Sequence, residues 1–153
     1  MRQKGFSLVE LLIVVAIIAI IVAIAVPNLL TSRQAAQSAA ASGDLRTINS
    51  AEIAYAAGAG NGSFGDFAAL GGTAAATNNY LPKGFANAAT TYSRSGYTGA
   101  FAIANNNSTY TVVCAPSSGI TNSALSYFTD ESGTIRWSNS GNATVNSTPI
   151  GVQ

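Results

Sequence analysis

Hydrophobic residues are concentrated in one long run near the start of the chain. Every residue from Leu11 to Val26 is Ala, Val, Ile or Leu, and residues 6–9 extend this run by a further turn. A helix needs about 20 predominantly apolar residues to cross the roughly 30 Å hydrocarbon core of a bilayer. The run therefore predicts a membrane-spanning helix that contains one carboxylate, Glu10. A carboxylate in this setting is costly enough that we expect it to have a partner and a role.

The helical pattern continues beyond the membrane run. Pro27 has no N–H group and is expected to kink the helix or loosen one turn. Beyond it, apolar residues recur every three or four positions on one helical face. They are Ala41, Leu45, Ile48, Ala51 and Tyr55. This stripe predicts an amphipathic helix that packs on a sheet and stops at Gly58 and Gly60.

Four charged side chains of this second half of the helix fall largely off the apolar stripe. They are Arg33, Asp44, Arg46 and Glu52. We expect all four at solvated positions, because an amphipathic helix places its charges away from the core.

The pattern of the last third of the chain predicts strands. Residues 97–104 and 109–115 alternate in polarity around an Asn-rich turn, and residues 125–129 and 133–138 form a second hairpin. The fold class predicted is α+β, with a long N-terminal helix packed on a C-terminal four-stranded antiparallel sheet. The expected divisions are a leader at 1–5, a membrane helix at 6–27, an amphipathic helix at 28–57, a helix-to-sheet loop at 58–96, and the sheet with an irregular tail at 97–153.

The composition of the chain argues against some classes of function. Charged residues make up 8% of the chain and the net charge is +1, so electrostatic binding of nucleic acid is not expected. The chain has one cysteine, Cys114, which excludes an internal disulfide. In a strand it is expected to be a buried small hydrophobe, the alternative being a reactive thiol.

No catalytic, metal-binding or cofactor-binding residue is expected. The chain has no histidine, which removes His-based triads and most zinc sites. The segment Gly60 to Gly65 satisfies G-x-G-x-x-G but follows a helix, whereas the nucleotide-binding motif must follow a strand. Asp130 and Glu131 are adjacent carboxylates, expected in a solvated turn rather than in a weak calcium site.

The leader has the wrong order for an ordinary secretory signal, because its basic residues lie directly before the only plausible cleavage point. Arg2 and Lys4 would hold the leader on the cytoplasmic side. Cleavage ahead of the apolar run would leave the helix on the mature chain, with the new amine one turn from Glu10. The amine of one subunit and the carboxylate of another could then neutralise each other. The alternative is a single-pass anchor with a stray acidic residue.

The residues from Arg2 through Ala16, followed by Pro27-Asn28, resemble the class III signal and helix of type IV pilins and their pseudopilin relatives. The resemblance covers about the first 30 residues closely. It implies that prepilin peptidase cuts after Gly5 and methylates Phe6, and that Phe6, Glu10 and Pro27 take part in assembly. The absence of a cysteine pair departs from the C-terminal disulfide of many pilins.

The resemblance implies a non-enzymatic subunit of a surface filament. Its partners would be further copies of the chain, prepilin peptidase, an inner-membrane assembly platform with its ATPase, and membrane lipid before assembly. The location would be the inner membrane first and the extracellular pilus afterwards. Two alternatives remain, which are a pseudopilin or minor pilin of a type II secretion or DNA-uptake machine, and a membrane-anchored ligand-binding domain.

Overall fold

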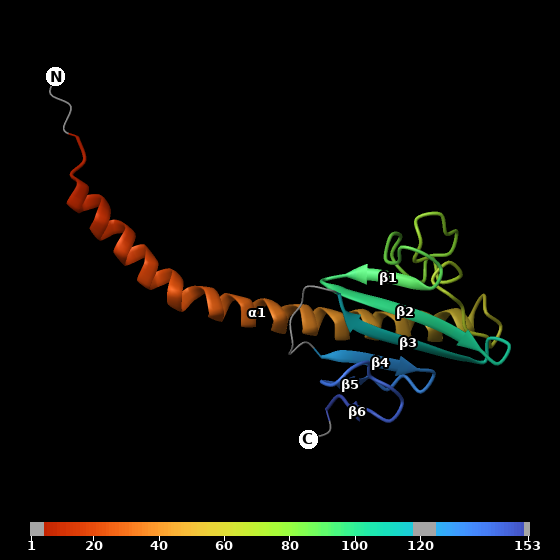
Figure 1. The fold of residues 1–153 in the computed structure, drawn as a ribbon. Coiled ribbons are helices and arrows are strands. Elements are labelled where there is room, and N and C mark those ends of the chain that lie inside the picture. Colours follow the sequence, from red (N-terminus) through yellow and green to blue (C-terminus); the bar gives the residue numbers. More distant parts are fainter. Residues whose placement is uncertain (1–4, 118–124, 152–153) are drawn as a thin grey trace. The chain divides into compact units, whose positions relative to one another are not determined.

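The computed structural model describes residues 5–117 and 125–151 (Figure 1). In this part of the chain, one helix precedes six strands. The chain divides into two compact units, Met1–Ala36 and Gln37–Gln153, which are described separately. The elements are α1 (Leu8–Ala57), β1 (Thr91–Arg94), β2 (Tyr97–Ala104), β3 (Thr109–Pro116), β4 (Ser126–Asp130), β5 (Arg136–Ser138) and β6 (Thr148–Pro149).

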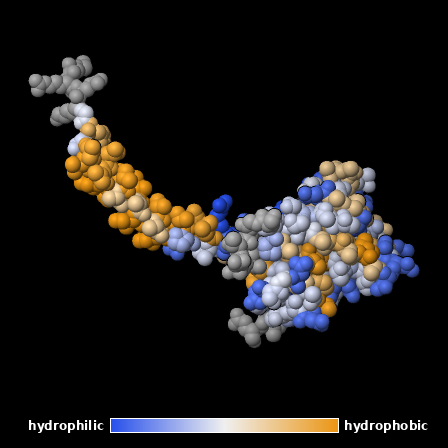
Figure 2. Space-filling view, viewed as in Figure 1, coloured by the Kyte–Doolittle hydropathy of each residue, from blue (hydrophilic) through white to orange (hydrophobic). Residues whose placement is uncertain are grey.

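In the N-terminal unit, the first part of α1 is apolar on all sides. Its large side chains from Leu8 to Leu30 are all exposed, and Figure 2 shows them as an almost continuous hydrophobic surface. The helix is long and apolar enough to cross a membrane. It runs through Pro27 without a break. The hydroxyl groups of Thr31 and Ser32 donate to the carbonyl of Asn28 at 3.0 and 2.9 Å, a local bonding pattern that often bends helices.

In the second unit, the helical stripe packs as predicted. Ala41, Leu45, Ile48 and Ala51 are buried in the core. The prediction for Glu52 is wrong, because its side chain is completely buried. Glu52 follows Ile48 by four residues, so helical spacing brings it to the same face as the apolar residues.

The sheet is a meander of six antiparallel strands in the order β1-β2-β3-β4-β5-β6, so the predicted number of four is wrong. The two long central strands, β2 and β3, lie where the alternation predicts them. The two missed strands are the edges, β1 with four residues and β6 with two. Strands this short carry too little alternation to predict, and pairing with longer neighbours stabilises them. Gly133, with a φ of 71°, belongs to the β4–β5 turn, where its N–H donates to the Asp130 carbonyl, and β5 begins at Arg136 instead of at the predicted residue 133.

The segment between α1 and β1 is part of the core. Four of its large apolar side chains are almost fully buried, Phe67, Leu70, Leu81 and Phe85, and the rings of Phe64 and Tyr80 are partly buried against the same core. Main-chain hydrogen bonds join its own turns, from Leu81 N–H to the Leu70 carbonyl at 2.8 Å and from Ala86 N–H to the Gly72 carbonyl at 2.9 Å. It therefore completes the hydrophobic core together with the helix and the sheet.

Candidate processing and assembly site

The start of α1 is capped by the side chains of two residues that the motif places three apart. The Ser7 N–H donates to Glu10 Oε2 at 3.0 Å, and the Val9 N–H donates to Ser7 Oγ at 3.3 Å. The first helical bond runs from the Leu11 N–H to the Ser7 carbonyl at 3.2 Å. This arrangement resembles a capping box, with the N-cap hydroxyl accepting from the second helical N–H instead of the third, and it satisfies main-chain donors that the helix itself leaves free. The Ser-x-x-Glu spacing that signals it is visible in the sequence, and our sequence analysis missed it.

The Gly5–Phe6 peptide bond lies just outside this capped helix. Both residues are exposed and lie ahead of the first helical residue, Leu8. A Cβ atom built on Gly5 would meet no atom within 4 Å. Exposed, non-helical peptide bonds are the kind that proteases cut most readily. The bond is therefore sterically open to a peptidase.

Glu10 is separated along the chain from the other charged residues of the helix by a long apolar stretch. After Lys4, no basic residue occurs before Arg33, and no other acidic residue occurs before Asp44. The negative carboxylate near the helix N-terminus is favoured by the helix dipole. From Leu8 to Val26, Glu10 is thus the one charged residue on an otherwise apolar, exposed stretch of helix.

The four predicted site residues do not form one cluster. Gly5, Phe6 and Glu10 lie within the first turn and its leading residues, whereas Pro27 lies about 26 Å further along the helix at 1.5 Å per residue. Pro27 can therefore influence only the course of the helix and takes no part in chemistry at its N-terminus.

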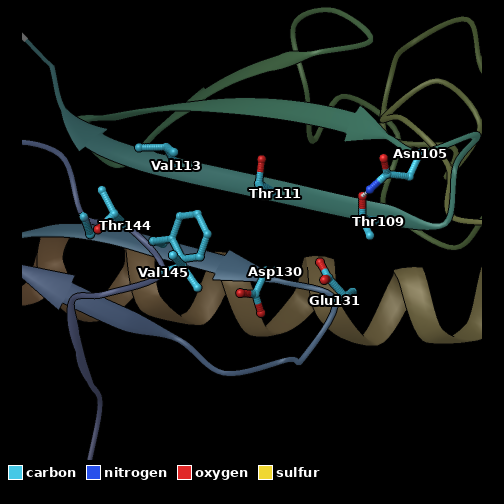
Figure 3. A pocket seen from close by; sticks show the side chains of 10 residues that line it. Asn105, Thr109, Thr111, Val113, Asp130, Glu131, Thr144 and Val145 are labelled. Carbon is cyan, nitrogen blue, oxygen red and sulfur yellow. Dashed lines mark hydrogen bonds between the residues drawn. The ribbon is translucent and has the colours of Figure 1, made fainter.

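A shallow groove of about 490 Å³ runs over β3, β4 and the C-terminal segment (Figure 3). The adjacent carboxylates Asp130 and Glu131 both line it. Asp130 is buried, contrary to the solvated position expected for it, and its Oδ1 accepts the Ser132 N–H at 3.0 Å, whereas Glu131 is exposed. Among the residues that the structure describes, no group of three or more His, Cys, Asp or Glu side chains gathers in a way that could hold a metal ion.

The lone cysteine is buried in β3, as predicted. Burial raises the pKa of the Cys114 thiol to about 11, against a smaller lowering by the neighbouring Tyr92 hydroxyl. The thiol therefore stays protonated at neutral pH and is a poor nucleophile.

Comparison with known proteins agrees with the geometry of the N-terminus. The family model of the prokaryotic N-terminal methylation motif matches residues 1–26. The type IV wide pilus major component PilA4 of Thermus thermophilus is 60% identical over 35 residues, which are 23% of this chain and 27% of that protein. The chain thus matches about a quarter of this relative's length, and no solved structure matches it. Residues 1–26 thus carry the prokaryotic N-terminal methylation motif, and the N-terminal region of the chain is similar to that of a type IV pilin.

Proposed function

We propose that the chain is a structural subunit of a bacterial type IV pilus. In this proposal, prepilin peptidase cuts after Gly5 and methylates the Phe6 amine, and the N-terminal helix then drives polymerisation into a surface filament. The observation that carries the proposal is the capped, fully apolar helix with one carboxylate, preceded directly by an open Gly–Phe bond inside a matched methylation motif. The inner membrane stores the subunit before the assembly platform and its ATPase extract it.

Glu10 has two roles in this proposal. Before assembly it caps its own helix through the Ser7 N–H. In the filament, the carboxylate pairs with the Phe6 amine of a neighbouring subunit. The pairing offsets the burial of two opposite charges, neither of which has another charged partner in the apolar bundle.

Processing is tested on protein isolated from the cells that make it. Mass spectrometry should find residues 1–5 absent and one methyl group on Phe6. Gly5→Leu should leave uncut precursor in the membrane, and because a Cβ atom at Gly5 meets nothing within 4 Å, the loss would report on the peptidase. Gly43→Ala is the matched control, since Gly43 also has open space around it. An intact Met1 in wild-type filaments, or a cut behind Val26, would refute the proposal.

The pairing role is separated from the capping role by Glu10→Gln. Glutamine keeps the acceptor that a capping box requires but removes the charge. The expected result is a protein that is made, inserted and cleaved, yet scarce in the fraction sheared from the cell surface. Ser7→Ala is the control, because it removes the bond from Val9 to Ser7 Oγ and leaves the charge. Wild-type filament yield from Glu10→Gln cells would refute the pairing.

Glu10→Leu gives a second test of the same pairing. By transfer energetics, it should improve membrane insertion by roughly 3 kcal/mol, so a simple anchor would be unharmed. A filament subunit would lose assembly, because the neighbour's amine stays buried and unpaired. The same sheared preparation separates a major pilin from a pseudopilin or minor pilin, since only the major subunit would dominate it.

A further inference from the structure

Glu52 is a fully buried carboxyl group near the C-terminal end of α1, with a relative exposure of 0%. Its Oε2 atom accepts the Gly65 N–H at 3.1 Å, and that is its one hydrogen bond in the described part of the chain. Its Oε1 atom is buried and has no hydrogen-bond partner there. A carboxylate normally enters a protein interior with several donors or a basic partner, and Glu52 has neither.

The groups that face Glu52 disfavour its charge. Asp66, from the segment after the helix, adds a second negative charge. Tyr110, from β3, also lies close enough to interact, but its hydroxyl donates to Asn49 Oδ1 at 2.9 Å. Asp130 and Glu131, at the β4–β5 turn, add negative charge around Tyr110. Across residues 5–117 and 125–151, the one ion pair joins Arg94 to Asp44, so no basic side chain pairs with Glu52.

The Glu52 carboxyl group connects the helix to the segment that follows it. Gly65 is held by the hydrogen bond to Glu52, and the preceding residue, Phe64, is held by the sheet. The Phe64 N–H donates to the Asn107 carbonyl at 2.8 Å, and the Phe64 ring lies 4.8 Å from the Tyr110 ring. The protonation state of Glu52 therefore acts where the helix, the following segment and the β2–β3 turn meet.

We propose that Glu52 makes the stability of the globular unit depend on pH, because its neutral carboxyl group tolerates complete burial whereas its ionisation, in a core that offers it no basic partner, destabilises the unit. The proposal concerns Gln37–Gln153 alone and does not depend on the proposed pilus function. It assigns a regulatory role to a side chain that the sequence pattern predicted to be solvated.

The direction of the pH dependence follows from burial. Burial raises the pKa of Glu52 from 4.5 to about 7, a rise that the Gly65 N–H partly opposes and Asp66 reinforces. The stabilising contribution is therefore full below about pH 4.5 and is lost as the pH rises through about 7. Because the chain has no histidine, the side chain that usually titrates in this range is absent.

Asp44 provides the matched control. Burial also raises the pKa of this carboxyl group, and the Arg94 guanidinium partly opposes the rise. Asp44 thus contributes in the same direction, but it is partly exposed and has a basic partner. Comparison of Asp44→Asn with Glu52→Gln separates the two carboxyl groups.

The test uses the full chain in detergent micelles, unfolded with urea between about pH 5 and about pH 8. The chain's one tryptophan, Trp137 in β5, reports unfolding of the globular unit by fluorescence. In the wild type, the unfolded-to-folded ratio at fixed urea should rise roughly a hundredfold over this range. Glu52→Gln should remove most of this rise, and Asp44→Asn should retain most of it.

A second measurement keeps the proposal falsifiable if Glu52→Gln does not fold. Hydrogen-exchange protection of the amides of the two long central strands, β2 and β3, corrected for intrinsic exchange at each pH, should fall in the wild type over the same range. Constant protection and a constant urea midpoint in the wild type would overturn the proposal. So would a pH dependence that persists in Glu52→Gln or that disappears in Asp44→Asn.

Discussion

Gly99, the third residue of β2, lies directly against an aromatic ring. It pairs with Tyr92 across the β1–β2 ladder, and a Cβ atom built on it would lie 1.8 Å from Tyr92 Cε1. The ring of Tyr92 is itself buried, with 1% exposure, so it has no free space into which to move. This glycine is required by close approach of a side chain and not by a turn.

Gly99→Ala should therefore destabilise the globular unit by about 1 to 3 kcal/mol, the range for an overpacked core. The urea midpoint followed by Trp137 fluorescence measures the change. Ala102→Ser, an exposed position on the same strand, is the control and should leave the midpoint nearly unchanged. A Gly99→Ala protein as stable as the wild type would mean that Tyr92 does not occupy this place.

At the scale of elements, α1 and the sheet are joined by a buried polar network centred on Asn49. Its Nδ2 donates to Thr129 Oγ1 at 2.9 Å and to the Gly133 carbonyl at 3.1 Å. Its Oδ1 accepts the Tyr110 hydroxyl at 2.9 Å. One side chain thus ties the helix to β3, β4 and the β4–β5 turn, and buried networks of this kind fix one arrangement of the elements.

Removal of the network should cost more than removal of one peripheral bond. We expect Asn49→Ala to lower the free energy of unfolding by about 2 to 4 kcal/mol, because Tyr110 and Thr129 would lose their buried partner. Tyr110→Phe should cost about 1 kcal/mol, since it removes one hydrogen bond and leaves the amide with its other partners. Equal effects of the two substitutions in urea unfolding would contradict a centre at Asn49.

Periodicity predicted the elements that are long enough to show it. The apolar stripe of α1 and the alternation of β2 and β3 are confirmed, whereas β1 and β6 are too short for a pattern. The spacing alone could have placed Glu52 and Asn49 in the core, since each follows a buried residue by four, but Glu52 was predicted to be solvated because it is charged, and no prediction was made for Asn49. Their burial depends on tertiary partners far along the chain, Gly65 and Thr129, which no local pattern contains.

The processing and assembly site was predicted from sequence because it is local. Gly5, Phe6 and Glu10 lie within six consecutive residues, so their chemistry depends on order in the chain and not on folding. Their roles remain a proposal. The capping bond from Ser7 to Glu10 adds a function that the motif alone does not reveal, since it gives Glu10 a structural partner before any neighbour is present.

At the scale of the whole molecule, the small number of charged residues decides how strongly stability depends on the salt concentration of the surroundings. Charged residues are 8% of the chain, and one ion pair, Arg94 to Asp44 at 3.7 Å, is present among the described residues. Raising sodium chloride from about 0.15 M to 1 M shortens the Debye length from about 8 Å to 3 Å, but few charge interactions are there to be screened. The globular unit should therefore be almost equally stable in fresh water and in brine, while the buried proton on Glu52 leaves it responsive to acidity.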